Sequence, residues 1–230
     1  MIATDILPTL RVVSLPGANP SSAQLSDYKS AYAMWKMVWS ETFRELDGLD
    51  KMFSDDFARQ DEILCVFRGP VCLALGLMRW RDIELPSVRE DSYFQMWPTE
   101  AIDGLRANGK DIIICCNLTI HPMARSNSLG LPMKDVMMGL LIQRFLESGA
   151  DAMTGAMRAD RGMHKTTYRL GATPLATGLV HHNSPVDLVA FFPQNMTGGE
   201  AEVARAVRYL WGVKRQHPIQ RARYKGAKNA

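Results

Sequence analysis

The sequence lacks several patterns that would assign it at once to a class of protein. No apolar run approaches the roughly 20 residues that a membrane-spanning helix needs. The first residues carry no basic start followed by a long apolar segment, so we expect no signal peptide. There is no Gly-x-Ser-x-Gly motif of a hydrolase and no glycine-rich kinase loop. These absences favour an ordinary globular protein of the cytoplasm.

Cysteine and histidine are scarce. The four cysteines show no Cys-x-x-Cys spacing and lie in apolar runs that we expect to be strands: Cys65, Cys72, Cys115 and Cys116. This placement predicts reduced thiols in the core rather than disulfides or a zinc site. No pair of the five histidines has the spacing of metal ligands, so we expect no metal.

Charge is nearly balanced overall but unevenly distributed. The formal net charge is +3, yet the segment Gly212 to Ala230 holds six basic residues and no acidic residue. This basic tail either is a solvated terminus or contacts an acidic partner such as a carrier protein, a nucleic acid or a phosphate. Nucleic-acid binding would rest on the tail alone, so we do not expect it.

The most informative stretch runs from Ile112 to Leu146. An apolar strand is ended by Pro122, because proline cannot donate to a sheet. A turn rich in Ser, Asn and Gly follows, and then apolar residues recur at spacings of three and four from Met133, which predicts a helix. Unpaired backbone N–H groups and the helix dipole at such a start favour a phosphate group.

Within this stretch, the residues IHPMARSNSLG from Ile120 to Gly130 resemble the acyl-CoA signature of the GNAT superfamily of N-acyltransferases. Ile120, Pro122, Arg125 and Gly130 are in register with the signature, whereas Ser128 stands where its first glycine is usual. The Cβ of a serine hinders close approach of a pyrophosphate. The resemblance implies that the donor site is formed by Leu118, Thr119, Ile120, Arg125, Ser126, Asn127, Ser128, Leu129, Gly130 and Leu131.

The other expected elements follow the GNAT order. Strands are predicted at about 9–15, 62–67, 71–80, 112–120, 152–158, 175–181 and 186–192, and helices at about 26–46, 99–106, 133–146, 160–170 and 200–213. The implied fold is α/β (α+β), with a mixed, mostly antiparallel central sheet that is flanked by helices and splayed at its central strands. We expect a GNAT-like acyltransferase domain at 1–193, and a C-terminal helix and basic tail at 194–230.

Proton transfer has few candidates. The family commonly ends its short helix with Tyr-x-x-x-Gly-Phe, whose tyrosine protonates the leaving thiolate. Here Thr167 holds that position and Tyr168 follows it, about 100° further around a helix. Tyr168 is therefore either the general acid or a half-buried packing residue. His121 is either the base that deprotonates the amine or a loop residue, and the other candidates are Glu84, Glu90, Glu100 or a chain of waters.

Further resemblances concern the acceptor side. In the family the first helical region walls the acceptor pocket, which implies roles for Trp35 and Trp39 unless both belong to the core. The segment from Gly76 to Trp80, with the long insertion after it, resembles the branch of autoinducer synthases and long-chain N-acyl amino acid synthases. That branch implies substrate contacts from Arg79 and Trp80, and an acyl carrier protein as an alternative donor.

The sequence therefore predicts an enzyme that transfers an acyl group from acyl-CoA (acetyl-CoA or longer), or from an acyl carrier protein, to a small-molecule primary amine. The amine would attack the thioester directly, and backbone N–H groups near Leu118 or Thr119 would stabilise the oxyanion, as in the family. The alternative is a GNAT-fold protein that binds acyl-CoA without turnover. Ser128, the displaced Tyr168 and the absence of a carboxylate at 117–119 favour that alternative.

Overall fold

One mixed sheet organises the protein. The structure, a computed structural model, describes residues 4–50, 52–125 and 129–213. Seven strands form one sheet in the order β1-β2-β3-β4-β5-β7-β6, and all neighbours are antiparallel except β4 and β5. The strands are β1 (Leu10–Leu15), β2 (Glu62–Arg68), β3 (Val71–Asp82), β4 (Asp111–Ile120), β5 (Ala152–Arg158), β6 (Thr173–His181) and β7 (Ser184–Phe191). The predicted mixed, mostly antiparallel sheet is confirmed.

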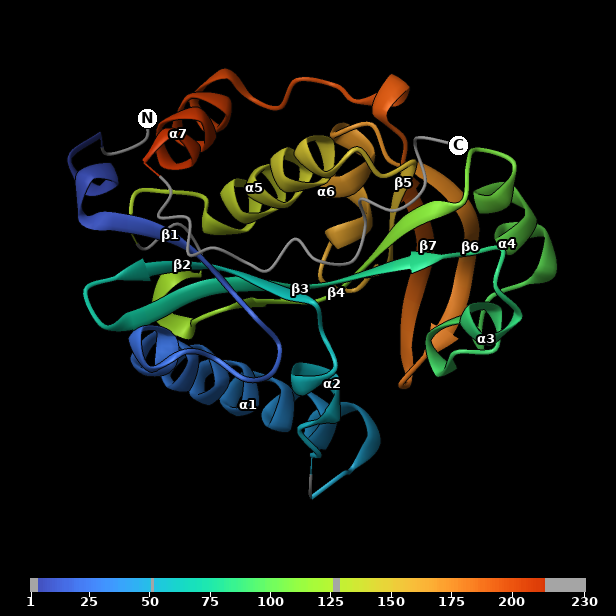
Figure 1. Cartoon of the computed structure of the whole chain (residues 1–230), viewed down its shortest axis with the longest axis horizontal. Coiled ribbons are helices and arrows are strands. Elements are labelled where there is room, and N and C mark those ends of the chain that lie inside the picture. Colours follow the sequence, from blue (N-terminus) through green and yellow to red (C-terminus); the bar gives the residue numbers. More distant parts are fainter. Residues whose placement is uncertain (1–3, 51, 126–128, 214–230) are drawn as a thin grey trace.

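Helices cover both faces of this sheet. In Figure 1, α5, α6 and α7 lie above the sheet, and α1 and α2 lie below it. The helices are α1 (Leu25–Asp47), α2 (Asp55–Ala58), α3 (Pro86–Arg89), α4 (Thr99–Arg106), α5 (Met133–Ser148), α6 (Met163–Arg169) and α7 (Ala201–Gly212). Among these described helices none is long and apolar enough to cross a membrane.

Two predicted elements have the bounds that the sequence indicated, the helix 99–106 and the strand 152–158. By contrast, α6 begins at Met163 rather than near residue 160. Gly162 takes a left-handed conformation there (φ 66°), and Asp160 is held in the preceding turn by an ion pair with Arg158. The short helices α2 and α3 were not predicted, because four residues give no helical period.

The upper face carries the largest apolar cluster. It is formed by β-strand residues together with α5 and α7, including Val136, Leu140 and Phe145 of α5 and Val207 and Leu210 of α7. The C-terminal helix therefore shares its core with the sheet. A domain boundary near residue 193 remains a prediction, and the basic residues of the tail from Lys214 onward lie outside the described residues.

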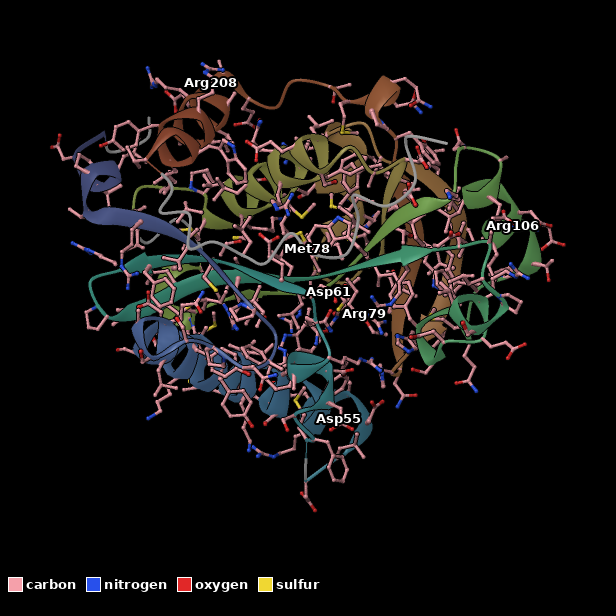
Figure 2. All side chains as sticks on the ribbon, in the orientation of Figure 1. Asp55, Asp61, Met78, Arg79, Arg106 and Arg208 are labelled. Atoms are coloured by element: carbon pink, nitrogen blue, oxygen red, sulfur yellow. The ribbon has the colours of Figure 1, made fainter. Side chains whose placement is uncertain are left out.

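The lower face carries two smaller clusters. One joins α1 to β1, β2 and β3, and the other joins α3 and α4 to β4, β5 and β7. Successive side chains of a strand point to opposite faces of the sheet, and this alternation determines which cluster each residue joins. On β3, Met78 points to the α5 side, and its neighbour Arg79 points to the opposite side (Figure 2). All four cysteines lie in strands with free thiols.

Candidate functional site

The site begins where two central strands part. β4 and β5 pair in parallel only from Ile112 to Ile114, opposite Ala152 to Thr154. Beyond Ile114, β4 continues to Ile120 and is paired with β3 alone, whereas β5 continues beside β7. We call this point, at Ile114 and Thr154, the fork. The predicted splaying of the central strands is confirmed, and beyond the fork the described part of β4 is no longer paired with β5.

A bulge in β4 lies just beyond the fork. Asn117 has a positive φ of 50°, and the register with β3 shifts by one residue at this point. The Thr119 hydroxyl donates to the Asn117 carbonyl at 2.6 Å and accepts from the indole N–H of Trp39 at 2.9 Å. The bulge thereby directs Thr119 toward α1, while Leu118 and Ile120 pack on the α5 side.

The turn after β4 leads directly into α5. The His121 N–H donates to the Leu73 carbonyl at 2.8 Å, and Arg125 donates from Nε to the Ile120 carbonyl at 3.1 Å, with its side chain exposed. Gly130 takes a φ of 65°, a conformation that favours glycine, and Leu131 is buried. Ser126, Asn127 and Ser128 lie outside the described residues, so the proposed pyrophosphate contacts of these three remain predictions.

The Tyr168 hydroxyl already has a hydrogen-bond partner. Its hydroxyl donates to Asp187 at 2.7 Å, and the other Asp187 oxygen accepts from the Gly178 N–H at 3.0 Å. Burial, followed by the bond to Asp187, raises the pKa of Tyr168 well above its ordinary value. Thr167, at the family's tyrosine position, is fully buried and donates to the His164 carbonyl. A general acid at Tyr168 would have to leave Asp187 to protonate a thiolate.

His121 is held as a neutral imidazole. Its Nδ1 accepts from the Met123 N–H at 3.2 Å. Burial, with a smaller contribution from the positive charge of Arg125, lowers the pKa of His121. A neutral ring can accept a proton from an ammonium group, which keeps His121 a candidate base. Glu84 is committed to Arg106 at 2.9 Å, and Glu90 and Glu100 are exposed.

The two tryptophans of α1 differ in placement. Trp35 is fully buried among core residues, in ring contact with Tyr32 and Phe57. Trp39 is half-buried and bonds Thr119 at the bulge. Trp39 therefore contacts a residue of the expected donor site directly, whereas Trp35 packs in the core.

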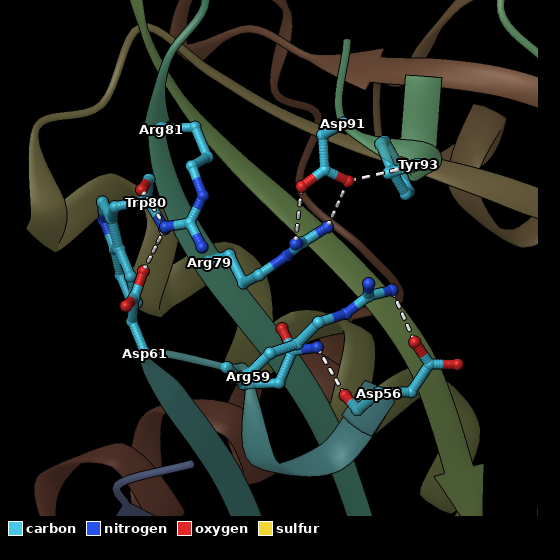
Figure 3. Close-up of polar contacts among 9 residues, drawn as sticks. Asp56, Arg59, Asp61, Arg79, Trp80, Arg81, Asp91 and Tyr93 are labelled. Carbon is cyan, nitrogen blue, oxygen red and sulfur yellow. Dashed lines mark hydrogen bonds and ion pairs between the residues drawn. The ribbon is translucent and has the colours of Figure 1, made fainter. Parts of the chain in front are cut away.

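Arg79 anchors a polar cluster on the lower face (Figure 3). It pairs with Asp91 through both guanidinium N–H₂ groups, at 3.0 and 3.3 Å, and its side chain is only 3% exposed. Asp91 also accepts from the Tyr93 backbone N–H at 2.9 Å. Trp80 points to the opposite face, where the guanidinium of Arg144 lies 4.8 Å from its ring. The structure thus separates two residues that we assigned to one substrate site.

Asp91 and Tyr93 are residues that sequence reasoning missed. One signal was available. Arg79 is a charge inside the otherwise apolar strand Val71–Trp80, and a buried guanidinium requires an acidic partner. The sequence does not say which carboxylate that is, since Asp91 lies in a segment without a regular period. In the part of the chain that the structure describes, no group of three or more His, Cys, Asp or Glu side chains could hold a metal ion.

Comparison with solved structures identifies the fold. Mosquito arylalkylamine N-acetyltransferase like 5b superposes with a TM-score of 0.57 at 11% identity, over 80% of this chain and all of the other. The CoA-dependent acyl-homoserine lactone synthase MesI gives 0.54 at 11% identity, over 90% and 97% of the chains. The chain has the GNAT fold.

A third GNAT structure agrees. BjaI, a CoA-dependent acyl-homoserine lactone synthase solved with SAM and isopentyl-CoA, gives a TM-score of 0.53 at 14% identity, over 86% of this chain and 98% of its own. No family profile and no curated protein sequence matches the chain. At these identities the likeness is one of fold, so the reaction must be argued from the site.

Proposed function

We propose that this GNAT-fold protein is an N-acyltransferase that moves an acyl group from acyl-CoA to a primary amine by direct attack on the thioester. The observation that carries the proposal is the fork. β4 leaves β5 after Ile114 and passes through the bulge at Asn117 and the turn at Arg125 into α5. A thioester can hydrogen-bond to β4 there as an added strand would, with its phosphates toward the start of α5.

The donor half of the site is supported by the turn. The first four N–H groups of α5 have no partner within the helix apart from the Val136 N–H, which reaches Pro132, and no side chain caps the helix at Pro132. The exposed Arg125 adds a positive charge beside them. Together these features favour the phosphates of CoA. An acyl carrier protein, which presents a phosphopantetheine, is the other donor that this chemistry admits.

The alternative function is acyl-CoA binding without turnover. One observation favours it: the Tyr168 hydroxyl is bonded to Asp187 and is therefore not free to protonate a thiolate. The segment 117–119 also carries no carboxylate that could act as base.

Two measurements on the same preparation separate these functions. Thermal unfolding is followed with CoA, acetyl-CoA, a long-chain acyl-CoA and an acyl carrier protein, because a ligand at 100 times its Kd adds about 2.7 kcal/mol of stability. Release of free thiol is then measured with a panel of primary amines. Stabilisation with thiol release supports the transferase. Stabilisation without thiol release with any amine would support acyl-CoA binding without turnover. If no donor stabilises the protein, both proposed functions are contradicted.

A further inference from the structure

Three unpaired hydrogen-bond donors gather near the fork. Among the described residues, Arg79 Nε, the Tyr93 hydroxyl and Asn117 Nδ2 are buried without a hydrogen-bond partner. Arg79 lies opposite Ile114, the last residue of β4 that pairs with β5, and Asn117 lies three residues further along β4. A buried donor without a partner destabilises the folded protein. Because all three groups donate, an acceptor oxygen, of a bound ligand or of water, would complete them.

Tyr93 is the best placed of the three. Its side chain packs against the buried cluster that contains Ile114 of β4 and Ala152 of β5, so it lies close to the point where the strands part. No hydrogen bond of normal geometry joins Tyr93 to Thr154, whose own hydroxyl donates to the Val189 carbonyl at 2.9 Å. The Tyr93 hydroxyl is therefore buried close to the fork without a hydrogen-bond partner of normal geometry.

The surrounding structure holds this tyrosine rigidly. Asp91 accepts from the Tyr93 backbone N–H and at the same time pairs with Arg79 (Figure 3). The Tyr93 ring packs against Phe94 and Trp97, with centroids 5.0 and 5.6 Å apart. A donor that is fixed before the reaction needs no reorganisation when charge develops, which is the basis of electrostatic catalysis.

We propose that Tyr93 is a catalytic residue whose hydroxyl donates a hydrogen bond to the thioester carbonyl oxygen as it becomes an oxyanion. This inference rests on the proposed acyl transfer. The amine nitrogen forms a bond to the carbonyl carbon, and the carbonyl electron pair moves to oxygen. When the intermediate collapses, the carbon–sulfur bond breaks and the thiolate leaves with its electron pair, while the ammonium proton passes to water. Tyr93 keeps its own proton throughout.

Two further observations agree with a role as donor rather than acid. Burial raises the pKa of Tyr93 well above its ordinary value, so the hydroxyl stays protonated at physiological pH. Tyr168, the candidate general acid, donates its hydroxyl hydrogen to Asp187. The pairing of β4 with β5 ends at Ile114 and Thr154, so a thioester that binds further along β4 does not replace a strand pairing.

The test is Tyr93→Phe, with the exposed Tyr209→Phe on α7 as the matched control. Loss of one oxyanion donor lowers kcat by about 100-fold or more, with little change in KM for the acyl donor. Because the hydroxyl has no partner in the free protein, Tyr93→Phe should unfold at the same temperature as the wild type or higher. Tyr209→Phe should change neither quantity.

The outcomes are distinguishable. A wild type that turns over, with a Tyr93→Phe kcat within threefold of it, would overturn this inference and leave the proposed function intact. A Tyr93→Phe variant that loses activity together with several degrees of unfolding temperature would show a structural role, and would overturn it as well. A wild type that releases no thiol with any donor would overturn the proposed function and this inference with it.

Discussion

At the scale of single residues, the candidate site contains a buried charge that needs a counter-charge and a backbone conformation that is costly for most side chains. Arg79 is the clearest case, because a guanidinium with 3% of its side chain exposed depends on Asp91 for compensation. Asn117 is the second, because its left-handed backbone is costly for most side chains. Each leads to a prediction about stability.

We expect Asp91→Asn to destabilise the protein by about 2 kcal/mol, since it leaves the buried charge of Arg79 without a counter-charge. Urea unfolding at pH 7 measures this. The control is Asp103→Asn, whose pair with Arg106 is an exposed one and should contribute almost nothing. Equal midpoints for Asp91→Asn and the wild type would contradict the buried pair.

The same pair predicts a pH dependence. Burial on its own would raise the pKa of Asp91, but the Tyr93 N–H and the Arg79 guanidinium outweigh it, and the pKa of Asp91 is lowered. A carboxyl whose pKa is lower in the folded state stabilises the protein fully above its unfolded pKa, about 4, and loses that effect as the pH falls further. Between pH 5 and pH 2, the wild type should therefore lose more stability than Asp91→Asn, which titration of the urea midpoint would show.

At Asn117 we expect alanine and glycine to differ. Asn117→Ala keeps the left-handed backbone with a side chain that tolerates it poorly, which should cost about 1 kcal/mol. Asn117→Gly relieves this strain and should stay within about 0.5 kcal/mol of the wild type. Equilibrium unfolding of both variants decides the matter, and an alanine variant as stable as the glycine variant would mean that the bulge is not strained.

At the scale of elements, strand and helix assignments followed from local pattern, and the turn that joins β4 to α5 is where we propose that the donor phosphates bind. The apolar period of α5 and the proline after β4 fixed where those elements lie, and the structure confirms both. What the pattern could not give was the bulge at Asn117, because a bulge depends on the register with β3, a strand some 40 residues away along the chain.

The turn makes a prediction of its own. Arg125→Glu places a negative charge near the expected phosphates and should weaken CoA binding by about tenfold, or about 1.4 kcal/mol. Arg208→Glu, an exposed reversal on α7 (Figure 2), is the matched control and should not change the affinity. Calorimetric titration with CoA measures both. Unchanged affinity in Arg125→Glu would remove this turn from the donor site.

At the scale of the whole molecule, the packing of α7 bears on whether the chain has a domain boundary near residue 193. Val203, Val207 and Leu210 of α7 are buried in the cluster that also holds α5, and a Cβ on Gly139 of α5 would lie 2.6 Å from Val207. Such close packing is typical of one folding unit. The predicted boundary near residue 193 can therefore be tested directly.

We expect a chain ending at residue 193 to lose about 5 kcal/mol or more, because three large apolar side chains leave the core at roughly 1.5–3 kcal/mol each. A chain ending at residue 213 keeps α7 and should unfold at the same temperature as the full chain. Calorimetry of the two truncations gives the answer. A shorter chain that unfolds as the full chain does would establish 1–193 as an independent domain.

The sequence by itself determined the order of strands and helices, since periodicity, proline and glycine act locally along the chain, and the resemblance to the GNAT signature added the mixed sheet with its splayed centre. Only the tertiary structure decided which side chains meet. Asp91 and Tyr93 lie near the fork although they come from a segment without a regular period. The Tyr168 hydroxyl donates to Asp187, and Trp80 lies on the opposite face of the sheet from Arg79. The physical reason is that partners of a buried polar group are fixed by register and packing between distant segments, and no local pattern encodes those.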